Sequence, residues 1–64
     1  MKLIEIAEII KQKRKQERLT QKDVSMSTGV GVRYISDLEN AKPSCEIGKA
    51  LKVLEALGIK INFQ

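Results

Sequence analysis

The 64-residue sequence contains no histidine, one cysteine (Cys45) and two aromatic residues, Tyr34 and Phe63. Without histidine there can be no histidine-based catalytic triad, and one cysteine alone supports neither a Cys/His zinc site nor a disulfide within this chain. RRM- and OB-type binders of single strands stack bases on aromatic side chains, so the low aromatic content argues against them. A chain this short rarely forms a catalytic cleft. We therefore expect no enzymatic activity, no cofactor and no metal.

Long apolar runs are also missing, because Lys2, Glu5 and Glu8 interrupt the apolar residues of the first ten positions. We therefore expect no membrane span and no secretory signal peptide. A lone thiol is typical of a reducing compartment, which favours the cytoplasm.

Charged residues are abundant: 12 Lys and Arg against 8 Asp and Glu leave a net charge of +4. This excess favours a polyanionic partner.

Apolar residues at helical spacing predict an all-α fold of four to five short helices. A first helix is expected over residues 3–17, with its apolar face formed by Leu3, Ile6, Ala7 and Ile10. Its basic stretch, residues 11–18, is interpreted as a solvated face. Thr20 with Asp23 three positions later predicts a capping box for a second helix over residues 21–28, which Gly29 ends.

The second half of the sequence predicts two further helices and a tail. The third helix is expected over residues 32–40. Ser44 is expected to cap the fourth, which opens with an irregular turn around Gly48 and closes at Gly58. Its apolar stripe comprises Ile47, Ala50, Leu51, Leu54 and Leu57. Residues 59–63 alternate apolar and polar, which predicts a strand that needs a partner from outside this chain. The alternative is a tail that packs Ile59 and Phe63 against the helices.

Two short helices joined at Gly29 favour a helix-turn-helix, whose second helix presents its outer face to the DNA major groove. Apolar residues at matched spacing are expected to hold the two helices at a fixed angle: Val24, Val30, Ile35 and Leu38. An ordinary helical hairpin shows the same pattern. The segments 19–24, 28–30 and 35–40 (LTQKDV, TGV and ISDLEN) resemble the Xre/Cro/cI family, which implies a lambda-repressor-like DNA-binding domain.

Residues 42–49 and 51–58, followed by the alternating tail, are similar to the HipB-type antitoxins within that family. This resemblance implies a helix-turn-helix domain over residues 1–58 and a dimerisation strand over 59–64. It also implies a homodimer that represses its own operon at palindromic operator DNA and binds a HipA-like Ser/Thr kinase toxin. The interface expected between the two copies comprises Leu54, Leu57, Ile59, Ile61 and Phe63.

The resemblance also assigns roles to single residues. Contacts to DNA phosphate fall on Thr20, Gln21, Asn40 and Lys42, and Tyr34 either contacts the backbone or packs beside the turn. Base-reading positions fall on Gly31, Val32, Arg33, Ser36 and Asp37. Arg33 is the strongest of these, because a guanidinium pairs with guanine O6 and N7. Asp37 either accepts from a cytosine amino group or, as the commoner case, pairs with Arg33 four residues earlier.

An ion pair is expected between the first and third helices. Members of the family often pair an arginine of the first helix with a glutamate that ends the third, which Arg14 and Glu39 match. The alternative is that Arg14 faces phosphate. Gly31 departs from the family's Ser/Thr cap, Thr28 from an apolar residue and Ser25 from alanine, which makes the operator harder to infer. Cys45 is expected to be a small filler rather than a redox thiol.

Two rival functions remain open at this point. One is a phage or restriction-type regulator without a toxin partner. The other is an interaction module whose basic first helix binds a protein or a membrane surface without recognising DNA.

Overall fold

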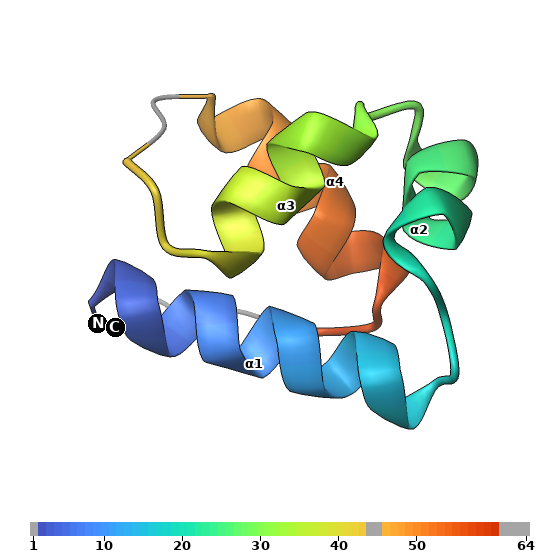
Figure 1. Ribbon diagram of the computed structural model, residues 1–64, viewed down its shortest axis with the longest axis horizontal. Helices are drawn as coiled ribbons and strands as arrows, with labels where there is room; N and C mark the ends of the chain where they lie inside the picture. The colour runs from blue at the N-terminus through green and yellow to red at the C-terminus, as the bar shows by residue number, and fades with distance from the viewer. Residues whose placement is uncertain (1, 44–45, 61–64) are drawn as a thin grey trace.

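The computed structural model describes residues 2–43 and 46–60, and this part of the chain contains four helices and no strand (Figure 1). The helices are α1 (Leu3–Gln16), α2 (Gln21–Thr28), α3 (Val32–Glu39) and α4 (Ile47–Ala56). α1 runs along one side of the molecule, and the other three helices pack together across it (Figure 1). The all-α prediction is therefore confirmed for the described residues, with four helices rather than five.

The predicted capping box at the start of α2 is confirmed. The Asp23 amide donates to the Thr20 hydroxyl at 3.0 Å, and the Thr20 amide donates to the Asp23 carboxylate at 2.8 Å. The hydrogen bonds from Thr20, first from its backbone, lower the pKa of Asp23. At the other end of α2, Gly29 adopts the left-handed conformation, with φ at 75°, and closes the helix as predicted.

The helices α1, α3 and α4 end in the same backbone conformation. The sequence indicated it only for α4, where Gly58 follows the helix. In each, the residue after the helix cap is left-handed: Arg18 (φ 58°), Ala41 (φ 57°) and Gly58 (φ 70°). The amide after each of these donates to the carbonyl five positions back, at 2.9–3.0 Å. These bonds form Schellman motifs, which satisfy carbonyls at the helix ends. Arg18 and Ala41 adopt this conformation despite their Cβ atoms.

The core confirms the apolar residues predicted to hold α2 and α3 together. Val24, Val30, Ile35 and Leu38 are all buried, and they meet Ile10 of α1. α4 differs from the prediction, because its buried face centres on Val53, Leu54 and Leu57. Ile47 and Leu51 lie to one side of that face and are 69% and 46% exposed. The expected stripe was therefore misplaced: it included Ile47 and Leu51, which the neighbouring helices leave uncovered, and omitted Val53, which is 0% exposed.

The start and the end of α4 also refine the prediction. The helix begins after Glu46, so its cap is not the predicted Ser44, which lies outside the described residues. Gly48 belongs to the regular helix, and the predicted irregular turn there is wrong. Beyond Gly58, Ile59 and Lys60 are not in a strand, and the rest of the predicted strand lies outside the described residues. Within residues 2–43 and 46–60, no helix has the length and apolar character to cross a membrane.

Candidate nucleic-acid interface

Four of the five predicted base-reading residues lie on the outer face of α3, and the fifth, Gly31, is the residue before the helix. Gly31, Val32 and Arg33 are exposed, and Ser36 and Asp37 are half-buried. The opposite face of the helix is fixed by Ile35 and Leu38, which are 0% and 3% exposed. An eight-residue helix of this kind presents a rigid edge, because its inner side chains have no freedom to move independently.

Arg33 and Asp37 do not form the pair that was favoured from their spacing. Lys42, after the end of α3, instead contacts Asp37, with its Nζ 3.4 Å from Asp37 Oδ1. Within the described part of the chain, Arg33 has no hydrogen bond or ion pair. The turn at Ala41 directs the chain back beside α3, which brings Lys42 to Asp37. Among residues 2–43 and 46–60, then, nothing pairs with the exposed Arg33 guanidinium.

A buried ion pair positions the end of α3. Arg14 Nε donates to Glu39 Oε2 at 2.6 Å and Arg14 Nη2 donates to Glu39 Oε1 at 2.9 Å. Arg14 Nη1 also donates to the Leu19 carbonyl at 2.7 Å. The predicted structural pair is therefore present, and Arg14 does not face solvent as a phosphate contact would. Burial alone would raise the pKa of Glu39, but the hydrogen bonds from Arg14 and Gln21 and nearby positive charge hold that pKa below its usual value.

The predicted phosphate contacts lie on segments that meet at one end of α3. The Gln21 side chain donates to Glu39 Oε1 at 3.2 Å, so the N-terminus of α2 lies beside the C-terminus of α3. Thr20 is exposed before α2, and Asn40 and Lys42 are exposed after α3. The first turn of α2 carries amides with no partner inside the helix, which suits an anionic oxygen. Gln21, however, uses its amide group within the protein.

Tyr34 is the one predicted phosphate contact that the structure assigns mainly to packing. Its hydroxyl donates to the Glu46 carbonyl at 3.0 Å, and Lys49 Nζ lies 5.6 Å from the centre of its ring. Tyr34 is half-buried and packs against the core. Of the two roles left open by the sequence, these contacts favour packing, and they tie α3 to the first turn of α4.

Comparison with known proteins agrees with this geometry. Residues 10–64 match the family model described as Helix-turn-helix. The chain belongs to the helix-turn-helix family. It is also 41% identical over 59 residues to the "Uncharacterized HTH-type transcriptional regulator y4mF" of Sinorhizobium fredii (strain NBRC 101917 / NGR234). That match covers 92% of this chain and 78% of the relative. No solved structure matches the chain.

Two of the residues predicted to join two copies of this helix-turn-helix protein, Leu54 and Leu57, are not available on its surface. Leu54 and Leu57 are only 5% and 4% exposed because they fill the protomer's own core. Ile59 is partly buried against the same core. Ile61 and Phe63 lie outside the described residues. Burial inside the protomer therefore corrects the prediction for Leu54 and Leu57.

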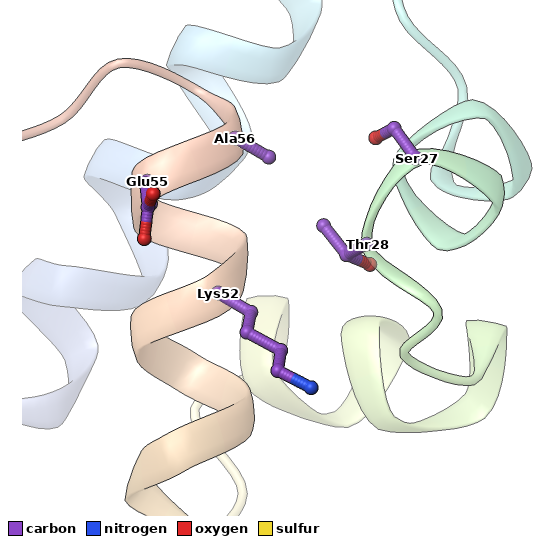
Figure 2. Close-up of a pocket in the computed structure, with 5 residues that line it drawn as sticks. All are labelled: Ser27, Thr28, Lys52, Glu55 and Ala56. Carbon is purple, nitrogen blue, oxygen red and sulfur yellow. The ribbon is translucent and has the colours of Figure 1, made fainter.

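A surface pocket lies between the end of α2 and α4 of this helix-turn-helix protein (Figure 2). It is lined by Ser27, Thr28, Lys52, Glu55 and Ala56. The Ser27 and Thr28 hydroxyls both donate to the Val24 carbonyl, at 3.2 and 2.7 Å. The Thr28 oxygen also accepts from the Val30 amide at 3.1 Å, which stabilises the turn before α3. Thr28, which departs from the family pattern, thus has a structural role here.

Sequence reasoning missed some surface residues. Arg18, an exposed cation between α1 and α2, was assigned only to a solvated basic stretch. The exposed Ile47 and Leu51 were assigned to the core, since the apolar pattern does not distinguish the covered part of a helix from the uncovered part.

Proposed function

We propose that this helix-turn-helix protein is a sequence-specific, DNA-binding transcriptional repressor. The observation that carries the proposal is the outer face of α3. It presents Val32 and Arg33 to solvent while the inner face is locked into the core. The relative named above is called an HTH-type transcriptional regulator, which supports the same activity for this chain. A net charge of +4 favours association with a polyanion.

Base reading is assigned to the exposed residues of α3. Arg33, which has no partner in the described part of the chain, is free to donate two hydrogen bonds to guanine. A bidentate contact of this type contributes about 1–3 kcal/mol of discrimination. Val32 is 41% exposed and suits the methyl group of thymine. Ser36 can donate or accept, and Gly31 lets the start of α3 approach the bases closely.

Phosphate contacts are assigned to the two segments that meet at the end of α3. Thr20 and the first amides of α2 supply one contact, and Asn40 and Lys42 supply the other. Their role is to fix the register of α3 in the groove, since contacts to phosphate carry no direct sequence information. Bound in this way at its operator, the protein blocks access by RNA polymerase.

Two copies are expected to act together. A single short helix reads only a few base pairs, whereas two copies on a two-fold axis place their reading helices about 34 Å apart, one turn of DNA. A palindromic operator then doubles the contacts. We propose a cytoplasmic homodimer, with a helix-turn-helix domain over residues 1–58 and a tail over 59–64 that contributes to dimerisation.

The biological setting proposed is a toxin–antitoxin operon. The similarity of residues 42–58 and the tail to HipB-type antitoxins supports an antitoxin that represses its own operon and binds a HipA-like kinase. The alternative is a regulator of the same family without a toxin partner. A kinase-like gene directly beside this gene supports the antitoxin, and its absence supports the alternative.

The proposed DNA binding is tested by titrating the protein into fluorescent duplexes of its own upstream region and of shuffled sequence. We expect tight binding to the first duplex only. The logarithm of the affinity should fall steeply with the logarithm of the salt concentration. Lys42→Ala should reduce that slope by about 0.9, one phosphate contact, whereas the control Lys52→Ala, beside the pocket of Figure 2, should leave it unchanged. Equal, weak binding to both duplexes would reject a sequence-specific repressor and favour the interaction module.

A further inference from the structure

The pocket between the last turn of α2 and α4, here called the α2–α4 pocket, has no role in the proposed binding of DNA (Figure 2). Ser27 and Thr28 line it from α2, and Lys52, Glu55 and Ala56 line it from α4. None of these five residues belongs to the predicted base or phosphate contacts. The volume is about 340 Å³, at the lower end of the range of small-molecule sites, about 300–1,000 Å³. The pocket therefore has room for a small organic molecule.

Two opposite charges line this pocket without pairing. Lys49 forms an ion pair with Glu46, three positions away on α4, at 3.0 Å. Lys52 and Glu55 have the same separation, yet across residues 2–43 and 46–60 neither has a hydrogen bond or an ion pair. In Figure 2, Lys52 extends from α4 toward the side on which α2 lies. An ammonium group and a carboxylate that line one pocket and do not contact each other suit a ligand that carries both charges.

The hydroxyl groups of α2 add acceptors to the pocket rather than donors. The Ser27 and Thr28 hydroxyls both donate to the Val24 carbonyl, at 3.2 and 2.7 Å, so each hydroxyl hydrogen is already used. The Thr28 oxygen also accepts from the Val30 amide at 3.1 Å. A hydroxyl oxygen has two acceptor positions, which leaves Ser27 Oγ able to accept from a ligand. In Figure 2 this oxygen faces α4 across the pocket, so the ligand must bring the hydrogen-bond donor.

Methyl groups occupy the rest of the space between the two helices. Figure 2 shows the Ala56 methyl group directed toward α2, and Thr28 turning its methyl group toward α4 and its hydroxyl away. These two groups offer contact to a short apolar side chain. The small volume favours a short side chain over a long one.

We infer that the α2–α4 pocket is a binding site for a small zwitterion, of the class of amino acids with short side chains. The ligand carboxylate contacts the Lys52 ammonium group. The ligand ammonium group donates to Ser27 Oγ and faces the Glu55 carboxylate. Such charge-assisted hydrogen bonds are stronger than neutral ones, but Lys52 and Glu55 are exposed, so we expect dissociation constants in the millimolar range. This inference goes beyond the proposed binding of DNA and does not depend on it.

A ligand in this pocket would contact the residue that holds the turn before α3. The Thr28 hydroxyl binds the Val30 amide, and Val30 is itself buried in the core, two residues before α3 begins at Val32. Packing against the Thr28 methyl group would therefore change the surroundings of the Val30 amide. This amide gives a signal that is specific to the pocket, because Val30 does not line it.

The test titrates the ¹⁵N-labelled full chain with L-alanine and follows the amide signals by NMR. We expect saturable shifts at Ser27, Lys52, Ala56 and Val30. L-Lactate has no ammonium group and L-alaninamide has no carboxylate, while both keep the same carbon skeleton. Each should bind more weakly than L-alanine by about threefold or more, as expected when an ion pair open to solvent is lost.

Two variants assign these preferences to single residues. Lys52→Met should remove the preference for L-alanine over L-alaninamide, and Glu55→Gln should remove the preference for L-alanine over L-lactate. Both side chains are exposed, so the fold should persist, and the same spectra verify it. The matched control is Lys22→Met, which makes the same change in net charge at an exposed position of α2 outside the pocket. It should leave all three dissociation constants unchanged.

Three results would overturn the inference. One is the absence of saturable shifts in the wild type. Another is equal binding of L-alanine and L-lactate, which would make the pocket a site for anions in general. The third is a preference for L-alanine that survives in Lys52→Met and Glu55→Gln, which would place binding elsewhere. DNA takes no part in these measurements, so their outcome leaves the proposed function to its own test.

Discussion

The guanidinium of Arg14, on α1, and the carboxylate of Glu39, at the end of α3, are joined by two hydrogen bonds of 2.6 and 2.9 Å. Gln21, at the start of α2, donates to the same carboxylate at 3.2 Å. One acidic side chain therefore connects three helices at the end of the candidate reading helix. The side chains of the pair are 12% and 2% exposed, so solvent screens their attraction little.

Glu39→Gln should destabilise the protein strongly. The substitution leaves the buried Arg14 charge without a carboxylate, and breaking a buried pair in this way costs about 3–5 kcal/mol of unfolding free energy. Urea denaturation followed by circular dichroism measures the loss. The control is Glu17→Gln, which breaks an exposed 3.1 Å pair with Lys13 and should change stability by no more than about 0.5 kcal/mol. Equal effects of the two substitutions would show that Glu39 has no special role.

Replacing both Arg14 and Glu39 should lower the free energy of unfolding less than replacing only one of them. Arg14→Met combined with Glu39→Leu leaves no unpaired charge and fills the space with apolar groups. We expect a coupling energy of at least about 2 kcal/mol in the double-mutant cycle. Additive effects would contradict a direct interaction.

Stability should fall as the pH falls through the acidic range, in part because of Glu39. Its pKa is lower in the folded protein than in the unfolded chain, where a glutamate has a pKa of about 4.3. The unfolded chain therefore binds the proton first. The contribution is complete above the unfolded pKa and is lost as the pH falls toward the folded pKa. Unfolding free energies from pH 7 to pH 3 should decline more steeply for wild type than for Glu39→Gln. Asp23, whose pKa is also lowered, is present in both proteins. Parallel curves would contradict this assignment.

Ala41→Gly should stabilise the protein by about 0.5–1 kcal/mol. A left-handed residue with a Cβ is strained by about 1–2 kcal/mol, and part of the relief is offset by the greater freedom of glycine in the unfolded chain. The control is Ala50→Gly, within regular α4, which should lower stability by at least about 0.5 kcal/mol. The thermal midpoints of the two variants should therefore shift in opposite directions. A lower midpoint for Ala41→Gly would contradict the claim that Ala41 is strained.

Asp37→Asn tests whether Asp37 accepts from cytosine, one of the two roles that the sequence left open, or acts only through its ion pair with Lys42. Its ion pair with Lys42 is substantially exposed, so the stability change should be within about 0.5 kcal/mol. Removing the carboxylate frees Lys42 and reduces repulsion of phosphate, so we expect tighter binding to every duplex. A selective loss at one C·G pair would instead show that Asp37 accepts from cytosine.

Local signals predicted the elements around the turn well. Thr20 with Asp23, and Gly29, define the ends of α2 through contacts within a few residues, which a sequence displays directly. The resemblance to the Xre/Cro/cI family predicted the Arg14–Glu39 pair, although 25 positions separate these residues. The outward face of α3 followed from the inward spacing of Ile35 and Leu38.

The sequence did not predict the features that depend on tertiary packing. Ile47 and Leu54 both fit the apolar period of α4, and only the position of the other helices decides which is covered. Arg18 and Ala41 are left-handed although neither residue type signals that conformation. Spacing along α3 suggested that Asp37 pairs with Arg33. The turn at Ala41 instead brings Lys42 beside Asp37, and a local sequence pattern does not show this turn.

The central claim, that the outer face of α3 reads base edges, is tested most directly with Arg33→Ala. Affinities of wild type and variant are measured against the upstream duplex and a set of its single-base-pair substitutions. We predict that the variant loses discrimination at one G·C position in each half-site, about 1–3 kcal/mol, while weak binding to all duplexes persists. Unchanged preferences at every position would contradict the claim.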